Sequence, residues 1–491
     1  MPAPTSLPQQ SKKRRKLDHG SSVVSEIKSL EDELVAAVQA NTSLNKLADL
    51  VDLVVGKSLE PRDLSKGIYA LYRAFTLIIS TGKLSIQGDG PAKAVKTWLW
   101  ERLHSYTDFL VVLLKDEEKV LRTSSLQILF SLQKHLSTAQ TAATSASFSR
   151  PEFHLSHFRK IVSGLLLSPS RDGKHSEIDP DIVDKFYETW FSVYDDIRWF
   201  FLRECVNVLE KAPASQISTA TNLLSILERL QTFPTDNEEL NAWWVAELGA
   251  KPPKPKKIAS KDDDEDALPE APEDGEDDDD DWRKFFDEPA PVDDSKKSKS
   301  PAARLHKMTV HQSLHSLPSH RAVFTRAWLA FLPRLSAAKD EDVKRGLVIR
   351  ALNVMHRGVL PHLTRAILAM DWIAGCVDHG GSVGLLALNG LFTLMRDYNL
   401  DYPSFYTRLY AFLDRDVLHL KHRARFFRMT ELFLSSTHLP ATLLASFIKR
   451  LSRLSLNAPP AAIVMIIPFT YNILKKHPAL MVMIHRDGDS G

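Results

Sequence analysis

The sequence is poor in cysteine and glycine. Its two cysteines, Cys205 and Cys376, cannot build a disulfide framework or a cysteine-based zinc site, so we expect a reducing compartment. Glycine contributes 19 of the 491 residues, which is below the average usage of about 7%. Few positions therefore allow left-handed backbone or close approach to a phosphate, and this disfavours nucleotide enzymes with glycine-rich loops.

Long hydrophobic runs are also missing. The longest apolar stretch, 461–474, falls short of the roughly 20 residues that a bilayer requires, and it contains Pro468. It predicts a buried helix. The N-terminus does not show the basic and then apolar pattern of a signal peptide. We therefore expect no membrane insertion and no secretory route.

Motifs of catalysis are incomplete. No phosphate loop is present, and the glycine-rich stretch 380–384 lacks the required lysine. The triplet at 485–487 imitates that of kinases without the following Asn or an Asp-Phe-Gly motif. His311, His315 and His320 have partial metal-ligand spacing but no accompanying cysteines or catalytic glutamate. We predict no enzyme activity, no metal, no cofactor and no small-molecule substrate.

The charge distribution is strongly uneven. The formal net charge is +2, yet the stretch 262–281 holds fourteen acidic residues and no Lys or Arg, so the remainder carries +16. A basic body with an acidic internal segment suits a protein that works beside nucleic acid.

The pattern along the chain predicts helices only. From residue 22 onward apolar residues recur at spacings of three and four, as in Ile27, Leu30, Leu34 and Val38, and no useful alternating strand pattern occurs. So many successive helices favour a HEAT- or armadillo-like solenoid over a single bundle. We predict an all-α protein with two helical-repeat units joined by a disordered acidic linker.

Composition predicts the boundaries of these parts. We expect a disordered basic tail at 1–20, an N-terminal helical-repeat domain at 21–250, a disordered charged linker at 251–305, a C-terminal helical domain at 306–487 and a tail at 488–491. The linker contains one apolar island. We interpret it either as a docking segment or as a transient local cluster, and its members are Trp282, Phe285 and Phe286.

The C-terminal half carries a family resemblance. It lies in the segments LLALNGLFTLM at 385–395, YNLDYP at 398–403, KHRARFF at 421–427, FLSSTHLP at 433–440, FIKRL at 447–451 and APP at 458–460. In this order they resemble the CCAAT-binding-factor domain of nucleolar ribosome-assembly proteins, and the nucleolar complex protein four group in particular. The resemblance is strongest over 324–486 and looser in the N-terminal helices.

The resemblance implies a function. It implies a nucleolar, nuclear scaffold for maturation of the small (40S) ribosomal subunit and pre-rRNA processing, which forms a heterodimer with a large Nop-class protein inside the pre-ribosomal particle. The family continues past His485 and Arg486 with an acidic segment rich in Leu and Trp, whereas this chain reads DGDSG. We therefore expect the last helices of the family, and any partner contact that they make, to be missing.

Two basic clusters are candidate binding residues. The first is a dense run that serves either nuclear import or solubility, and it comprises Lys12, Lys13, Arg14, Arg15 and Lys16. The second predicts an RNA- or partner-binding ridge on two successive helices, formed by Lys421, Arg423, Arg425, Arg428, Lys449, Arg450 and Arg453. The alternative for the second cluster is an ordinary solvated helix face, or pairing with acids such as Asp414 and Asp416.

Two other classes of function stay open at this point. A transcriptional or chromatin cofactor fits the CCAAT-binding name and the acidic stretch, although no DNA-reading module is recognisable. An importin-like transport adaptor also fits, because HEAT solenoids build such receptors.

Overall fold

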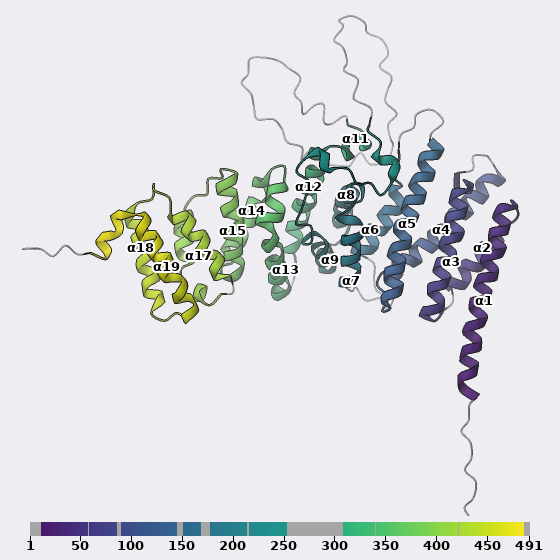
Figure 1. The fold of residues 1–491 in the computed structure, drawn as a ribbon, viewed down its shortest axis with the longest axis horizontal. Helices are drawn as coiled ribbons and strands as arrows, with labels where there is room; N and C mark the ends of the chain where they lie inside the picture. Colours follow the sequence, from purple (N-terminus) through teal and green to yellow (C-terminus); the bar gives the residue numbers. More distant parts are fainter. Residues whose placement is uncertain are drawn as a thin grey trace, which may run out of the picture. The chain divides into compact units, whose positions relative to one another are not determined.

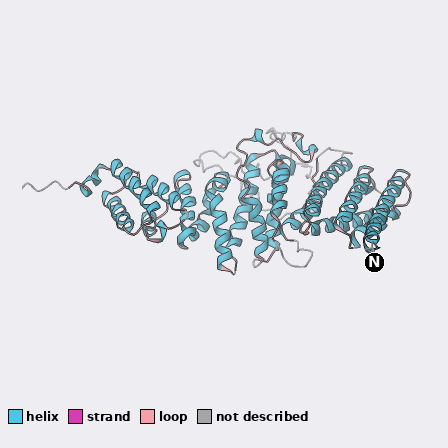
Figure 2. Ribbon diagram, turned by 60° about the horizontal axis from the view of Figure 1, so that its bottom comes forward, coloured by secondary structure: helices cyan, strands magenta, loops and turns pink. Residues whose placement is uncertain are grey.

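The structure is a computed structural model that describes residues 11–56, 58–85, 90–144, 151–167, 177–213, 216–252, 308–338, 340–420 and 422–485. Within these ranges the regular structure is helical and no strand occurs (Figure 2). The prediction of an all-α helical-repeat protein is therefore confirmed. Of the predicted linker 251–305, only residues 251 and 252 fall among the described residues.

Packing divides the chain into two units. Unit 1 comprises Met1–Ile226 and Pro234–Val323, and unit 2 comprises Leu227–Phe233 and Phe324–Gly491. The division between Val323 and Phe324 lies within a helix. The boundaries that we predicted from composition lie instead at the ends of the charged segment 251–305. The reason is that both flanks of the charged segment pack in unit 1. His311 and His315 each place Nε2 within hydrogen-bonding distance of the Leu248 carbonyl, at 3.2 and 2.8 Å, and the Leu317 amide donates to Asn237 at 2.7 Å.

Unit 1 consists of helices that pack on the next helix but one (Figure 1). One row is α1, α3, α5 and α7, and the other is α2, α4, α6 and α8. The helices are α1 (Ser11–Gln39), α2 (Asn45–Gly56), α3 (Pro61–Ser80), α4 (Pro91–Leu113), α5 (Lys119–Thr144), α6 (Leu155–Leu166), α7 (Pro180–Phe186), α8 (Asp195–Lys211), α9 (Ile217–Leu227) and α11 (Val310–Leu314). This alternation is the arrangement of a helical solenoid.

Unit 2 repeats the scheme. Helices α13, α15, α17 and α19 pack in one row, with α14 against α15 and α18 against α19. The helices are α12 (Leu317–Leu335), in which the division between the units falls, α13 (Glu341–Val354), α14 (Met370–Asp378), α15 (Gly381–Asp397), α16 (Phe405–Ala411), α17 (Arg423–Leu434), α18 (Ala441–Ser455) and α19 (Pro460–Lys476).

Two π-helical turns follow α-helices directly. These are η2 (Tyr187–Phe191), after α7, and η6 (Met355–Val359), after α13. The remaining short turns are 3-10 helices, namely η1 (Lys83–Ser85), η3 (Asn237–Glu239), η4 (Ala246–Gly249), η7 (Leu360–His362), η8 (Ala366–Ala369), η9 (Asp416–Leu418) and η10 (Pro478–Met483). A π-turn inserts one extra residue, so it changes which side chains of the following chain face the core.

Most of the predicted core positions are buried, with two corrections. The stripe from Ile27 to Val38 is buried. Helical spacing predicts that Val193 shares an apolar stripe with the buried Trp190, but Val193 is 44% exposed because the π-turn η2 precedes it. The stretch 461–474 forms α19 as predicted, but it is not buried all round. Its side chains Ile467 and Tyr471 are 64% and 63% exposed, because α17 and α18 cover only one face.

A search of the described helices for one long and apolar enough to span a bilayer finds none.

Candidate nucleic-acid interface

Helix α17 presents two opposite faces. Phe426 and Phe427 are buried with Met429, whereas Arg425 and Arg428 are exposed one turn apart. This follows from the helical period, which places residues three apart on one face and turns the intervening aromatics toward the core.

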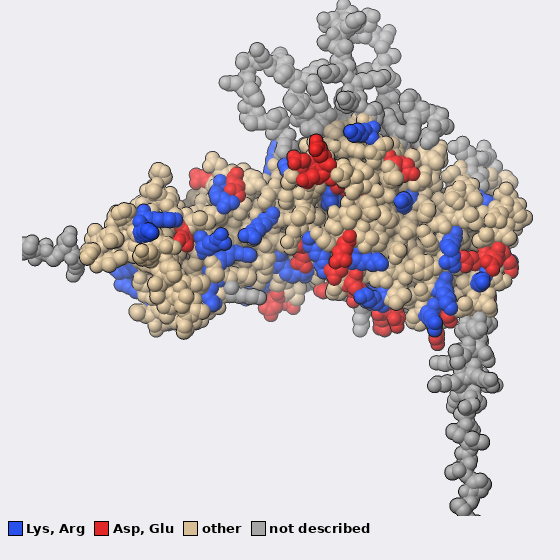
Figure 3. All heavy atoms as spheres, in the orientation of Figure 1, with Lys and Arg blue, Asp and Glu red and all other residues tan. Residues whose placement is uncertain are grey.

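The exposed arginines of α17 line a groove of unit 2. Figure 3 shows Lys and Arg side chains gathered over α15 and α17 on the visible face of this unit. The groove has three walls, and no Asp or Glu is among its lining residues: His356 and Arg357 from η6; Asn389, Phe392, Thr393 and Arg396 from α15; Ala424, Arg425, Arg428, Met429 and Leu432 from α17. We call it the basic groove.

The guanidinium groups of the basic groove differ in their partners. Arg396 forms a bidentate ion pair with Asp397 at 2.6 and 2.8 Å and lies over the Phe392 ring, 5.1 Å from its centroid. Arg357, Arg425 and Arg428 make no hydrogen bond or ion pair with any described residue. Three cations in this groove are thus available to an anionic ligand.

His356 reports the electrostatic potential of the groove. Burial first, and then the positive charges of Arg425 and Arg357, lower the pKa of its imidazole to about 4. The Nδ1 atom is buried and has no hydrogen-bond partner within the described structure. The imidazole is therefore neutral at pH 7 and adds no charge to that of the arginines.

Asn389 and Thr393 are the two buried polar side chains that line the groove. Asn389 is 8% exposed, and its side-chain amide makes no hydrogen bond with the described residues. Its backbone carbonyl accepts a hydrogen bond from the Thr393 hydroxyl at 3.1 Å. The amide therefore offers one acceptor and two donors to a groove ligand.

The predicted ridge residues of α18 do not line this groove. Lys449 and Arg453 are exposed elsewhere on the unit. Arg450 lies over the Tyr410 ring at 4.7 Å and donates to the Leu413 carbonyl, so it holds α18 against the neighbouring chain. Arg423 is half-buried and donates to the Leu420 carbonyl at 3.4 Å.

For the other predicted residues, either the whole residue or its side chain lies outside the described structure. Lys421 is not among the described residues, and neither is the apolar island with Trp282, Phe285 and Phe286. The run of Lys12, Lys13, Arg14, Arg15 and Lys16 falls within α1, but its side chains are not described.

The sequence prediction missed His356, Arg357, Asn389 and Arg396. None of them belongs to a charge run, and Asn389 stands inside an apolar helix. Only the packing of η6 and α17 against α15 brings them together.

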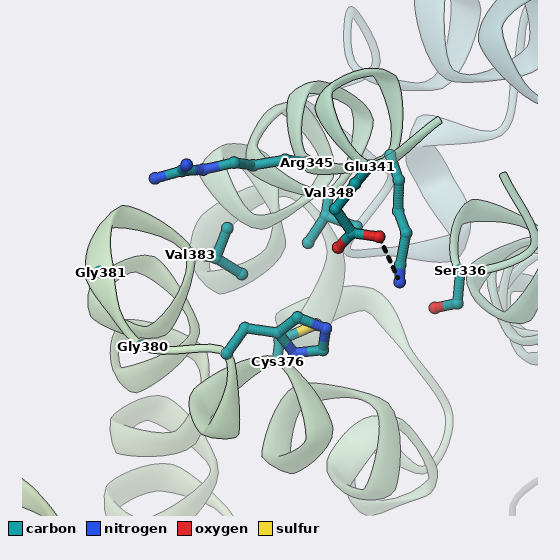
Figure 4. Close-up of a pocket in the computed structure, with 10 residues that line it drawn as sticks. Ser336, Glu341, Arg345, Val348, Cys376, Gly380, Gly381 and Val383 are labelled. Atoms are coloured by element: carbon teal, nitrogen blue, oxygen red, sulfur yellow. Dashed lines mark hydrogen bonds and ion pairs between the residues drawn. The ribbon is translucent and has the colours of Figure 1, made fainter. Parts of the chain in front are cut away.

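A second cavity of unit 2 contains a thiol (Figure 4). Glu341 and Arg345 of α13 reach it from one side, and Cys376 and Val383 from the other. Burial raises the pKa of the Cys376 thiol to about 12, so the thiolate that a nucleophile requires is not formed at neutral pH. The nearby His379 is held by its own helix, because Nδ1 lies 2.8 Å from the Gly375 carbonyl.

The three histidines with metal-like spacing contact backbone carbonyls. His311 and His315 share that of Leu248, and His320 lies 2.8 Å from that of Leu314. Across the described ranges no group of three or more His, Cys, Asp or Glu is placed to hold a metal ion.

Comparison with known proteins identifies the family. The family model "Nucleolar complex protein 4-like, TPR repeats" matches residues 18–214, and "CBF/Mak21 family" matches residues 384–491. An uncharacterised protein of Schizosaccharomyces pombe is 32% identical over 94% of this chain and 81% of its own length. The nucleolar complex protein 4 homolog of Rattus norvegicus is 30% identical over 92% of this chain and 76% of its own length. The chain belongs to the nucleolar complex protein 4 family.

Identity rises over a shorter segment. The human nucleolar complex protein 4 homolog is 47% identical over 170 residues, which are 35% of this chain. The CBF/Mak21 match at 384–491 includes the α15 and α17 walls of the basic groove from Asn389 onward, whereas Arg357 on η6 precedes it.

Membership of the nucleolar complex protein 4 family sets the cellular setting. The protein is nucleolar, hence nuclear, and acts in ribosome biogenesis. Its family is a helical-repeat type, in agreement with the helix rows of both units.

Proposed function

We propose that the protein is a non-catalytic scaffold in assembly of the small (40S) ribosomal subunit, and that it supports pre-rRNA processing as a heterodimer with a Nop-class nucleolar protein. The observation that carries this proposal is the basic groove, because three arginines without partners among the described residues offer a surface for other molecules.

The mechanism is binding. Ion pairs with phosphate or carboxylate groups supply affinity that falls with salt. The exposed apolar side chains of α19, Val464, Ile467 and Tyr471, support the protein-binding half of the proposal, since exposed apolar patches are typical of protein interfaces. Two sequence predictions remain part of the proposal: nuclear import through the run 12–16, and docking of the apolar island around Trp282.

Purification of the intact chain from nuclear extract at moderate salt tests the proposal. We expect small-subunit precursor RNA and a Nop-class protein to co-purify. If the intact chain brings down neither, the proposal is wrong. Association with chromatin that persists after RNase treatment would favour the transcriptional alternative, and direct binding to Ran would favour the transport alternative.

A further inference from the structure

We propose that the basic groove binds the backbone of single-stranded RNA, with Arg357 and Asn389 acting beside Arg425 and Arg428. This inference rests on the proposed function and names the ligand class of one of its surfaces.

The first argument is the charge of the groove. Arg357, Arg425 and Arg428 come from η6 and α17 and have no partner among the described residues. Guanidinium groups match the geometry of phosphate through paired N–H donors. Among the described residues, no carboxylate lines the groove. Its positive potential therefore favours a ligand with several negative charges in a row over a ligand that carries charges of both signs.

The second argument is Asn389, whose side chain is more than nine-tenths buried, lines the groove and has no hydrogen bond to the described residues. A ligand can therefore pair with this amide without breaking a hydrogen bond inside the described structure. The amide supplies both donors and an acceptor, and the ribose 2′-hydroxyl likewise donates and accepts. A carboxylate side chain of an acidic peptide only accepts.

The third argument is the depth of the groove. Asn389, Thr393 and Met429 are buried, whereas Arg357, Arg425 and Arg428 are exposed. The cations therefore stand above a recessed floor. The half-buried Phe392 adds apolar surface to it, and Leu432, which is 54% exposed, adds apolar surface at the rim. A single strand can lower its sugars and bases onto this floor, whereas a duplex would meet only the arginines.

Fluorescence anisotropy with the full chain tests the charge argument. The ligand is a labelled single-stranded RNA of about 12 nucleotides, within the usual site size of such surfaces. We expect the triple variant Arg357→Gln, Arg425→Gln, Arg428→Gln to bind at least roughly tenfold more weakly and to lower the log–log salt slope by about 2. All three side chains are exposed, so circular dichroism should show an unchanged fold.

The matched control removes the same charge outside the groove. It is the triple variant Lys449→Gln, Arg453→Gln, Lys475→Gln, whose side chains are exposed and do not line the groove. We expect it to weaken binding by less than about threefold. Equal losses in the two variants would mean a diffuse charge effect and would overturn the inference. The inference would also be overturned if the groove variant kept its affinity for RNA but no longer bound a poly-glutamate peptide, because the groove would then bind acidic protein segments.

Asn389→Leu tests the hydroxyl argument separately. The wild-type chain should prefer RNA to DNA of the same sequence, and the variant should lose that preference while it keeps the salt slope. If Asn389→Leu keeps the full preference for RNA over DNA, Asn389 does not contact the 2′-hydroxyl, and this result would contradict the inference. Failure of these binding tests leaves the proposed function standing if precursor RNA and the Nop-class protein still co-purify with the groove variant.

Discussion

His356 lies beside two guanidinium groups, and its protonation should respond to each of them. Burial first, and then Arg425 and Arg357, lower the pKa of the imidazole to about 4. Replacing Arg425 by Gln removes one positive charge, so the imidazolium form becomes less unfavourable and the pKa should rise. NMR titration of the His356 ring signals measures the change. Arg453→Gln, outside the groove, should leave the titration unchanged, and an unshifted pKa in Arg425→Gln would contradict the assigned electrostatic contact.

His157 makes stability depend on pH in the acidic range. It is buried, its Nε2 lies 3.0 Å from the Leu129 carbonyl, and burial lowers its pKa from 6.5 to about 3. The folded state therefore favours neutral imidazole. Its contribution to stability is fully present above pH 6.5 and decreases as the pH falls from there toward 3. Between pH 7 and pH 5 the loss from this one group is roughly 2 kcal/mol.

Urea unfolding at a series of pH values measures this loss. In His157→Gln a neutral donor replaces the imidazole, so the variant should be less stable at pH 7 but should depend less on pH between 7 and 5. The same slope in variant and wild type would show that other groups, such as His154 and His320, carry the dependence.

At the scale of helices, two glycines make a matched pair. A Cβ at Gly384 in α15 would lie 2.6 Å from Phe412 Cζ and 2.9 Å from the Val377 carbonyl oxygen, whereas a Cβ at Gly346 in α13 would have no atom within 4 Å. Gly384→Ala should therefore destabilise unit 2 by about 1 to 3 kcal/mol, because Phe412 and the backbone of α14 must move. Gly346→Ala should stabilise it by about 0.5 to 1 kcal/mol.

Thermal unfolding of both variants provides the measurement. Opposite shifts of the midpoint are expected. An unchanged unfolding midpoint in Gly384→Ala would show that α14 and α15 are not packed as closely as described.

The basic run at the start of α1 is an element with its own test. If Lys12, Lys13, Arg14, Arg15 and Lys16 form an import signal, changing all five to Ala should shift a fluorescent fusion of the full chain from the nucleus to the cytoplasm. The matched control changes five exposed or half-exposed basic residues elsewhere, namely Lys28, Lys46, Lys66, Lys93 and Lys96. Nuclear accumulation of the first variant would leave the run as a solubilising segment.

Periodicity predicted the helical character of the chain and little of the groove. The stripe from Ile27 to Val38 is buried because a 3.6-residue period places these positions on one face. Pro440 and Pro459 stand at the starts of α18 and α19, where a missing N–H group breaks no helical hydrogen bond. Arg357 and Asn389 were identified as candidate binding residues only from the structure, because no local sequence pattern predicts that η6, α15 and α17 pack together.

At the scale of the whole chain, we expect the acidic stretch to limit non-specific binding. Deleting residues 262–281 removes fourteen acidic residues and no Lys or Arg, so the net charge rises from +2 to +16. We expect the deletion variant to bind unrelated RNA on the order of tenfold more tightly at low salt, because long-range attraction is no longer offset. Filter binding across a salt series gives the comparison. A scrambled segment of the same composition should restore the wild-type affinity, and an unchanged affinity after deletion would contradict this role.

The π-turn η6 gives the groove an unusual sensitivity to chain length. A π-turn holds one residue more than an α-turn, and each residue advances a helix by about 100°. Arg357 lies inside this turn. Deleting a single residue there would turn its guanidinium to another side of the helix, although every arginine of the groove would still be encoded. Relatives with a gap at this point should therefore hold their ligand differently even where their arginines are the same.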